Sequence, residues 1–463
     1  MFKKVQYIHF VGIGGIGMSG IAELLNNLGF DITGSDIKYS ENVKRLESIG
    51  IEISIGHNSK NINNVDAVVY SSAVSSNNPE IVSAINKSIP VIRRAEMLGE
   101  LINLKQTSIA VGGTHGKTTT SSMIGMILEK SGYDPTLVVG GLVSNLNTNV
   151  KLGSGDMIVV EADEFDRSFL ALNPTIAVVT NLELEHTDCY VDLNDIENAF
   201  LQFCKSVPFY GAVILCCDSD SLVKIMPKIK KPVITYGLSK EADYRAGNIH
   251  YTKNESKYNL FYKNKDLGEI KINVPGKHNV LNSLASIALG LEINVPLNSI
   301  KKGINSYKGV RRRFEIKRNK TAVIIVDDYA HHPTEVEATI KAAKNGWDKR
   351  IITVFQPHLY SRTRDFYKEF AVSLYNSDVI IITEIYAARE KPIEGINSKL
   401  ILQELDQLGH DNIHFLKNLN SLNKLLSEIV QTDDMVITMG AGDIWRYSDE
   451  YNKYLNDNHI KRK

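Results

Sequence analysis

The residues with the clearest chemical signature in this chain form a glycine loop that ends in a lysine and three threonines. Residues 113–120 read Gly-Thr-His-Gly-Lys-Thr-Thr-Thr and follow the apolar run 108–111. A strand, a glycine loop and a helix in this order hold phosphate. Backbone N–H groups surround the anion, Lys117 adds a positive charge, and the Thr118 hydroxyl can bind Mg²⁺. The loop is shorter than a Walker A loop, because Val111 stands where that pattern has its first glycine. The motif predicts a protein that uses ATP or GTP.

A second glycine loop stands near the start of the chain. Residues 12–17 read Gly-Ile-Gly-Gly-Ile-Gly after the apolar run 5–11, and Asp36 follows a second apparent strand at 30–33. This is the spacing of a Rossmann-like site, in which an acid about 20 residues beyond the glycines binds a ribose. The residues alone leave three alternatives open: a dinucleotide, another diphosphate, or a tight helix–strand turn without a ligand. Asp36 fits a turn equally well.

Polar side chains follow two apolar strands of the middle segment. Glu161 comes directly after the strand predicted at 157–160, and His186 comes shortly after the one at 175–180. Because ligands of open α/β sheets lie at the carboxyl ends of the strands, we expect both side chains beside the phosphate loop. An acid in this place is typical of a Mg²⁺ ligand in nucleotide enzymes, which is our prediction for Glu161. An isolated histidine is more often structural, so His186 carries little weight by itself.

Asparagines and arginines further along the chain give weaker patterns. Asn279 and Asn282 lie one turn apart on a predicted helix, opposite its apolar face, and the pattern alone predicts surface residues. The run 311–313 is three arginines, which normally marks a solvated linker. Here the run lies between the second and third predicted sheets, where an arginine could reach bound phosphate.

The last segment repeats the alternation of strands and helices, and three of its strands end in polar residues. These ends are Asp327–Pro333, Gln356–His358 and Gly440–Asp443. One such group is explained by turn chemistry, whereas three together favour a working cleft.

Composition limits the class of protein. A chain of 463 residues is expected to fold as two or three domains. Its 53 Lys and Arg equal its 53 Asp and Glu, so no basic field attracts nucleic acid. The four cysteines lack zinc or redox spacing, which indicates a reducing compartment. No signal peptide begins the sequence, and no apolar run approaches the roughly 20 residues of a transmembrane helix. We therefore expect a cytoplasmic protein that binds neither nucleic acid nor a membrane.

The alternation of strands and helices predicts an α/β fold with three domains. We expect a Rossmann-like domain at 1–105 and a P-loop domain with a parallel sheet at 106–310. Short alternating strands at 243–274 would extend the second sheet. A further doubly wound α/β domain is expected at 311–463.

Taken together, these motifs resemble those of the Mur ligase family over essentially the whole chain. The segments that carry the resemblance are, in order, Gly12–Gly20, Gly113–Thr120, Glu161–Glu164, His278–Asn282, Arg312–Phe314, Asp327–Pro333, Gln356–His358 and Gly440–Ile444. Each is weak alone, but their order is specific. The resemblance implies a UDP-binding domain, an ATPase-like centre and a C-terminal domain that closes over the cleft.

Within the family, the chain is most similar to the branch that joins L-alanine to the carboxylate of UDP-N-acetylmuramate in peptidoglycan precursor synthesis. The resemblance implies ATP as co-substrate and Mg²⁺ as cofactor. The carboxylate would take the γ-phosphoryl group of ATP, and the amine of alanine would then displace phosphate from the acyl phosphate. The first glycine loop would hold UDP and not a nicotinamide cofactor. We expect a monomer or a weak homodimer.

The resemblance also implies roles residue by residue. Lys117 would hold the β- and γ-phosphates, and Arg313 would offset charge on the transferred phosphoryl group. Thr118 and Glu161 would bind one Mg²⁺, and His186 a second. The other ATP contacts would be Gly113, Thr114, His115, Gly116 and Thr119 around the phosphates, Asn279 and Asn282 at the base, and Asp328 at the ribose. The UDP sugar would contact Gly12, Gly14, Gly15, Gly17, Asp36 and Ser71, with Tyr329, His331, His358 and Arg362 toward its muramoyl end and alanine.

Two features depart from the wider family. Ligases that add later residues carry a carbamylated lysine, and the stretch 200–204 contains no lysine, as in the alanine-adding branch. Arg389 stands where relatives usually have glycine.

Several alternatives stay open at this point. A recycling branch attaches an intact murein tripeptide to the same sugar, although its first glycine loop usually differs. Folylpolyglutamate synthase lacks the N-terminal UDP domain. Two alternatives are not ligases. One is an NAD-dependent oxidoreductase with a fortuitous phosphate loop, and the other is a nucleotide-switch binding module.

Overall fold

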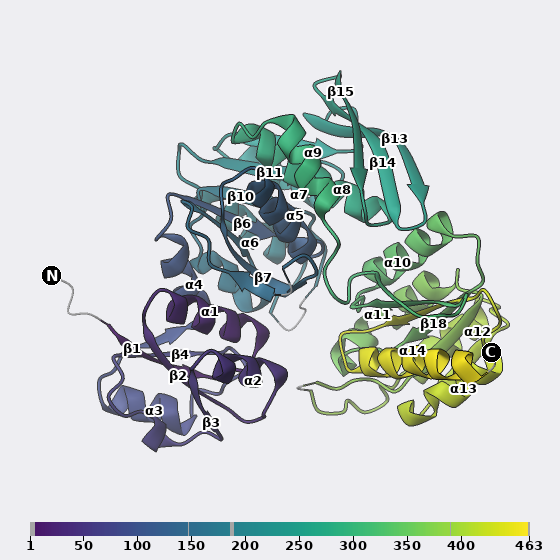
Figure 1. The fold of residues 1–463 in the computed structure, drawn as a ribbon, viewed down its shortest axis with the longest axis horizontal. Coiled ribbons are helices and arrows are strands. Elements are labelled where there is room, and N and C mark those ends of the chain that lie inside the picture. The colour runs from purple at the N-terminus through teal and green to yellow at the C-terminus, as the bar shows by residue number, and fades with distance from the viewer. Residues whose placement is uncertain (1–4, 147, 186–188, 389, 462–463) are drawn as a thin grey trace. The chain divides into compact units, whose positions relative to one another are not determined.

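The strands of this chain form three sheets in the part that the structure, a computed structural model, describes: residues 5–146, 148–185, 189–388 and 390–461. Helices alternate with these strands, so the predicted α/β class is confirmed (Figure 1). Contacts between Cα atoms divide the chain into two compact units. One comprises Met1–Gly247, Asn259–Ile270 and Leu281–Tyr307, and the other comprises Asn248–Tyr258, Lys271–Val280 and Lys308–Lys463. The domain boundaries at 105 and 310 stay predictions.

The first sheet is parallel and has the strand order β3-β2-β1-β4-β5. Its strands are β1 Tyr7–Val11, β2 Asp31–Asp36, β3 Glu52–Ile55, β4 Ala67–Tyr70 and β5 Val91–Arg93. The helices that accompany it are α1 Ile16–Asn27, α2 Glu41–Ser48, α3 Pro79–Asn86 and α4 Arg94–Ile102. The central strand β1 is buried except at Tyr7, and it leads into the first glycine loop. The order reverses direction beside β1, which is where such sheets bind ligands.

The second sheet has ten strands in the order β15-β14-β13-β12-β11-β10-β6-β9-β7-β8. Its strands are β6 Thr107–Gly112, β7 Thr136–Val143, β8 Thr148–Lys151, β9 Met157–Glu161, β10 Ile176–Val179, β11 Ala212–Cys216, β12 Val233–Gly237, β13 Tyr244–Thr252, β14 Glu255–Tyr262 and β15 Lys265–Ile272. Parallel partners β10 and β9 flank β6, the strand before the phosphate loop. The last three strands extend one edge, as the short alternating strands at 243–274 predicted.

Helix α5 (Lys117–Lys130) is buried on all sides along most of its length, which is why its sequence has little amphipathic character. Helix α9 (Leu297–Ser306) packs closely against it. A Cβ at Gly303 would come within 2.6 Å of the Cα of Ile127, so only glycine permits this approach. Close packing of this kind fixes the second half of α5 against α9. Gly132, with φ of +83°, follows the end of α5, where a glycine in the left-handed region commonly ends a helix. The remaining helices of this part are α6 Leu193–Ser206, α7 Asp220–Ile225 and α8 Lys277–Glu292.

The third sheet has the order β16-β17-β21-β18-β19-β20. Its strands are β16 Glu315–Lys317, β17 Ile324–Asp328, β18 Ile351–Phe355, β19 Val379–Thr383, β20 Ile413–Leu416 and β21 Met435–Met439. Side chains alternate along the strands between two hydrophobic cores: Ile380 and Ile382 enter one, and Val379 and Ile381 the other. Helices cover both faces, which is the doubly wound arrangement expected for this segment, and α14 lies across one of them (Figure 1). These helices are α10 Pro333–Gly346, α11 Tyr360–Leu374, α12 Lys399–Gln407, α13 Leu422–Ile429 and α14 Ile444–Lys461.

Helix α11 differs from the sequence-based expectation. The sequence predicts a helix from Arg364, but the helix begins at Tyr360, directly after Leu359 with φ of +70°. It also continues through a non-helical residue, Phe366. A start at a strained leucine has no capping signal in the sequence, which explains the error, and it brings Arg362 into the first turn.

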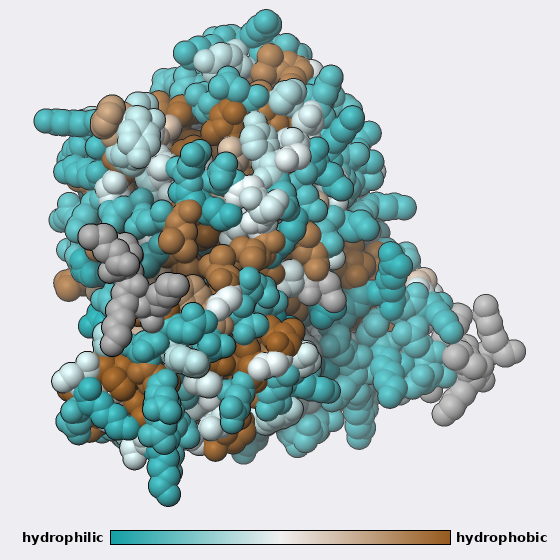
Figure 2. Space-filling view, turned by 60° about the vertical axis from the view of Figure 1, so that its left-hand side comes forward, coloured by the Kyte–Doolittle hydropathy of each residue, from teal (hydrophilic) through white to brown (hydrophobic). Residues whose placement is uncertain are grey.

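Among the helices of the described residues, none combines the length and the hydrophobicity that a membrane span requires. On the face shown in Figure 2, hydrophobic side chains lie in separate groups among hydrophilic ones.

Candidate functional site

The phosphate loop connects the carboxyl end of β6 to α5 and depends on two glycines. Gly113 has φ of +130° and Gly116 has φ of +84°, which L side chains rarely adopt. A Cβ would also lie 2.1 Å from Thr180 Oγ1 at Gly113, and 2.4 Å from Asn282 Oδ1 at Gly116. The loop therefore needs glycine at both positions for its backbone angles and for its close neighbours.

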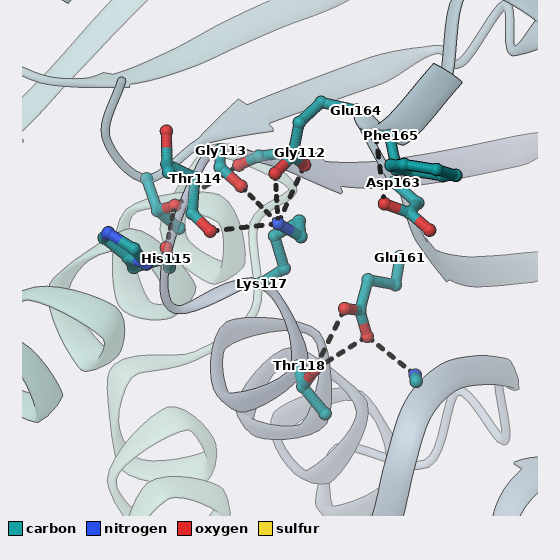
Figure 3. A network of polar contacts seen from close by, with 12 residues as sticks. Gly112, Gly113, Thr114, His115, Lys117, Thr118, Glu161, Asp163, Glu164 and Phe165 are labelled. Carbon is teal, nitrogen blue, oxygen red and sulfur yellow. Dashed lines mark hydrogen bonds and ion pairs between the residues drawn. The ribbon is translucent and has the colours of Figure 1, made fainter. Parts of the chain in front are cut away.

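Lys117 is the first residue of α5, and its ammonium group lies among oxygen atoms (Figure 3). Its Nζ is 2.7 Å from the carbonyl oxygen of Gly113, 3.0 Å from that of Thr114, and 2.7 Å from Oε2 of the fully buried Glu164. Burial by itself lowers the pKa of Lys117, but the neighbouring carboxylates, Glu164 foremost, raise it above its ordinary value. The ammonium is therefore charged at neutral pH, with Glu164 as the counter-ion that an anionic ligand would replace.

Glu161 ends β9 and faces Thr118 on the first turn of α5 (Figure 3). Thr118 Oγ1 is 2.9 Å from both carboxylate oxygens, and the N–H of Gly140 donates to Oε2 at 2.6 Å. Burial raises the pKa of Glu161, and the charge of Lys117 only partly opposes it. A hydroxyl and a carboxylate at this distance are hard oxygen donors that can bind one divalent cation together. Such a cation would offset the cost of burying the negative charge of Glu161.

The other predicted residues of the loop also lie in this cluster. Thr114 exchanges hydrogen bonds with the backbone of Glu183, at 3.3 and 2.9 Å. The His115 N–H donates to Asn181 Oδ1 at 2.8 Å, and the His115 ring Nε2 is 3.5 Å from a Glu183 carboxylate oxygen. Thr119 is buried in the first turn of α5. Gly113, Gly116, Lys117, Thr118 and Glu161 complete the set that the structure brings together. His186 lies outside the described residues.

The prediction from pattern alone that Asn279 and Asn282 lie on the surface is wrong. Both are 6% exposed, because α8 is buried around most of its circumference and not on one face alone. Asn282 accepts a hydrogen bond from Thr120 Oγ1 at 3.2 Å, which explains its place beside Gly116. Asn279 donates to the carbonyl of Pro275 at 2.6 Å.

The first glycine loop is held by the end of β2. The N–H groups of Gly12 and Ile13 donate to the carbonyl of Ser35 at 2.8 and 3.0 Å, and the Gly14 N–H donates to Asp36 Oδ2 at 2.8 Å. A Cβ on Gly12 would lie 3.3 Å from the Cβ of Ser71. Gly12, Gly14, Asp36 and Ser71 thus meet at the carboxyl edge of the first sheet. The structure adds that Asp36 binds the loop itself. The remaining two glycines, Gly15 and Gly17, lie at the start of α1, with Gly17 beside Arg94.

The predicted residues of the third sheet form a cluster of their own. Asp328, at the end of β17, accepts hydrogen bonds from the N–H groups of Phe314 at 2.7 Å and Ala330 at 2.8 Å. Arg313 is 3.1 Å from the Glu335 carboxylate and lies over the ring of Tyr329. These contacts place charged and aromatic groups at the carboxyl end of β17.

Two histidines and an arginine extend this cluster. His331 Nδ1 is 2.9 Å from the carbonyl of Tyr329, and its ring centroid is 6.0 Å from that of His358. Arg362 Nη1 lies 3.3 Å from His358 Nδ1. The structure thus brings Tyr329, His331, His358 and Arg362 together in one unit, whereas Arg389 lies outside the described residues.

The sequence alone does not indicate the roles of two residues of these clusters, Glu164 and Arg312. Glu164 lies in the acidic segment 161–164, whose pattern indicates no role for it, and only its distance of 2.7 Å to Lys117 reveals one. Arg312 donates to the carbonyls of Gly440 and Gly442 at 2.6 and 3.3 Å, and so ties the last glycine segment to the end of β17. A run of arginines gives no signal for such a partner.

Comparison with known families gives three matches in chain order. Residues 7–106 match "Mur ligase family, catalytic domain", residues 111–290 match "Mur ligase middle domain", and residues 312–442 match "Mur ligase, glutamate ligase domain". Together these segments span most of the chain.

Whole-chain relatives agree with these matches. A UDP-N-acetylmuramate–L-alanine ligase of Geotalea uraniireducens is 50% identical over 446 residues, which are 96% of this chain and 97% of that one. One of Trichlorobacter lovleyi is 48% identical over 98% of this chain and 100% of its own. The crystal structure of UDP-N-acetylmuramate–alanine ligase from Thermotoga maritima matches with a TM-score of 0.84 and 30% identity, covering 98% of this chain and 99% of that one.

Proposed function

The chain belongs to the Mur ligase family, and we propose that it joins L-alanine to the carboxylate of UDP-N-acetylmuramate with cleavage of ATP to ADP and phosphate. The observation that carries the proposal is the pair of glycine loops on two separate sheets. One has the lysine, hydroxyl and carboxylate that a Mg²⁺-bound triphosphate needs, and the other has the Gly14–Asp36 arrangement for a second nucleotide. Relatives of this name at about half identity over the full chain favour this acid and this amine.

The reaction has two steps. A carboxylate oxygen of the muramoyl group attacks the γ-phosphorus of ATP, the bond to the β–γ bridging oxygen breaks, and ADP leaves. The amine of L-alanine then attacks the acyl carbon, the carbon–oxygen bond to phosphate breaks, and the amine loses a proton. The first step brings two anions together, and in the second step negative charge develops on the acyl oxygen and leaves with phosphate, so the site must supply positive charge.

Lys117 supplies charge at the β- and γ-phosphates by exchanging Glu164 for phosphate oxygens. Glu164 is buried and is held by Lys117 at 2.7 Å, so it keeps the lysine charged and in place until the nucleotide arrives. Thr118 and Glu161 would hold Mg²⁺, which when bound polarises the phosphates. Arg313 would offset charge on the transferred phosphoryl group by the same kind of exchange with Glu335.

The remaining roles follow the family resemblance. Asn279, Asn282 and Asp328 would bind the adenosine end of ATP. The first glycine loop with Asp36 and Ser71 would bind UDP. Tyr329, His331, His358 and Arg362 would face the muramoyl group and alanine. Because UDP sugars and ATP are intracellular metabolites, we place the reaction in the cytoplasm, and we expect a monomer or a weak homodimer.

A labelled substrate tests the proposed acyl phosphate. With ¹⁸O in both oxygens of the sugar carboxylate, each turnover should place one ¹⁸O in the released phosphate, which mass spectrometry detects. Phosphate released without label would mean that ATP hydrolysis is not linked to the carboxylate, and would overturn the mechanism.

Activity is expected to depend on the protonation of Asp328. Burial raises the pKa of this carboxyl to about 6, against the opposing effects of Arg313 and the Phe314 N–H. As the pH falls through 6, the carboxylate gains a proton and loses one of its two acceptor oxygens. We expect kcat/KM for ATP to fall below about pH 6. In Asp328→Asn the value should be low throughout, without this limb. A wild-type profile that stays flat to pH 5, or the same limb in the variant, would contradict the role.

Two other functions are less well supported. A murein tripeptide ligase is one of them, because the two relatives described above, at about half identity over the full chain, are alanine ligases. A dehydrogenase would be protected against thermal unfolding by NAD, whereas the ligase should be protected by UDP-N-acetylmuramate and by ATP with Mg²⁺.

A further inference from the structure

A buried carboxylate outside the residues discussed so far lies next to the first glycine loop. Glu80 lies in the first turn of α3 and is 0% exposed. Its backbone N–H donates a hydrogen bond to the capping residue of the helix, at Asn78 Oδ1, at 2.9 Å. A fully buried glutamate is rare in proteins unless it is paired, because desolvation of the charge is costly. Its surroundings therefore need an explanation.

Five groups from three segments, namely β1, β2 and residues 57–61 after β3, converge on this carboxylate. They are Ser35 Oγ at 2.5 Å, Asn61 Nδ2 at 2.5 Å, the Asn58 N–H at 3.1 Å, His57 Nδ1 at 3.3 Å and His9 Nε2 at 3.7 Å. Burial by itself raises the pKa of Glu80, but the contact with His9 and hydrogen bonds from Ser35, Asn61 and the Asn58 N–H outweigh it and lower the pKa to about 2. The carboxylate is thus charged at any working pH, and the hydrogen bonds that it accepts are charge-assisted.

The cluster connects directly to the glycine loop through one residue. The Ser35 hydroxyl donates a hydrogen bond to Glu80, while the Ser35 carbonyl oxygen accepts hydrogen bonds from the N–H groups of Gly12 and Ile13. The next residue, Asp36, accepts the Gly14 N–H, and its own carbonyl accepts the N–H of Gly56, which precedes His57. A shift of the end of β2 would therefore move the loop, Asp36 and the segment that carries His57 together.

We propose that Glu80 is a positioning residue for the UDP end of the substrate, because it fixes the end of β2 and through it the first glycine loop. This inference rests on the proposed function, since it takes UDP as the ligand of that loop. Glu80 itself touches no substrate in this account. A site whose donors must match a diphosphate tolerates displacements of well under about 1 Å, so loss of the anchoring charge should weaken binding without changing the chemical step.

The test is Glu80→Gln, which keeps the shape but removes the charge. We expect the Kd for UDP by calorimetry, and KM for UDP-N-acetylmuramate, to rise about 10- to 100-fold, as loss of a charged hydrogen bond predicts. The Kd for ATP and kcat at saturating sugar should stay within about twofold. Glu23→Gln is the matched control, because Glu23 pairs with Arg45 in the same part of the chain but does not contact the cluster.

Asn61→Ala is the second variant, because it removes a single bond to Glu80 at a half-buried position and should give a smaller rise in the same two constants. Unchanged UDP affinity in a folded Glu80→Gln variant would overturn the inference. If that variant does not fold, unchanged UDP affinity in Asn61→Ala would do the same. Wild-type protein that fails to bind UDP or the UDP sugar would instead overturn the proposed function.

Discussion

Lys117→Ala should lower the rate of phosphate release by about 10³-fold or more, while binding of the UDP sugar persists. The lysine is the cation of the phosphate loop, held within 3.0 Å of two loop carbonyls, and alanine leaves the γ-phosphate without this charge. Removal of one preorganised charge or donor from a phosphoryl-transfer site typically costs this much. Phosphate release and calorimetric titration with UDP-N-acetylmuramate check the two halves of the prediction.

Lys130→Ala provides the control for this experiment. Lys130 is the exposed last residue of the same helix, and its replacement should leave both measurements unchanged. Lys117→Ala leaves Glu164 buried without its cation, which could destabilise the fold. Measured binding of the UDP sugar therefore also serves as a check that the variant is folded. Normal turnover in Lys117→Ala would refute the assignment of the phosphate loop.

Glu161→Gln should have the second largest effect, a fall of about 10²- to 10³-fold in kcat. Glutamine can still accept hydrogen bonds from Thr118 and the Gly140 N–H, so the local structure should survive. It cannot supply the negative charge that binds a divalent cation. The Mg²⁺ concentration for half-maximal activity should therefore rise as well, which a titration of Mg²⁺ at fixed ATP measures.

The matched control for this substitution is Glu129→Gln. Glu129 lies near the far end of α5 and pairs with Lys151, so the same chemical change there should alter neither kcat nor the Mg²⁺ requirement. An unchanged Mg²⁺ requirement in Glu161→Gln would mean that the cation binds elsewhere.

The sequence predicted the central strands and the residues at their ends well, for a physical reason. Buried parallel strands are continuous apolar runs, such as Ile351–Phe355 and Val379–Thr383, and their ends are marked where polar residues begin. Glu161 and Asp328 each stand at the carboxyl end of such a strand, in the second and the third sheet respectively, whereas their roles in the reaction stay predictions.

What could not be predicted depends on tertiary partners. Asn282 is buried because Thr120 and the loop glycine face it, and these lie more than 150 residues away in the sequence. The three-residue edge strand β16 exists only through its pairing with β17. Glu80 has no local pattern at all, since its partners come from β1, β2 and the segment after β3. Such contacts need the folded chain.

The measurement that tests the central claim most directly is phosphate release from ATP and Mg²⁺ with UDP-N-acetylmuramate, compared for L-alanine, an L-alanyl murein tripeptide and no amine. We predict release that requires both the UDP sugar and L-alanine. Release with the tripeptide alone would move the chain to the recycling branch. No release with either amine, from folded protein that binds ATP, would contradict the proposed reaction.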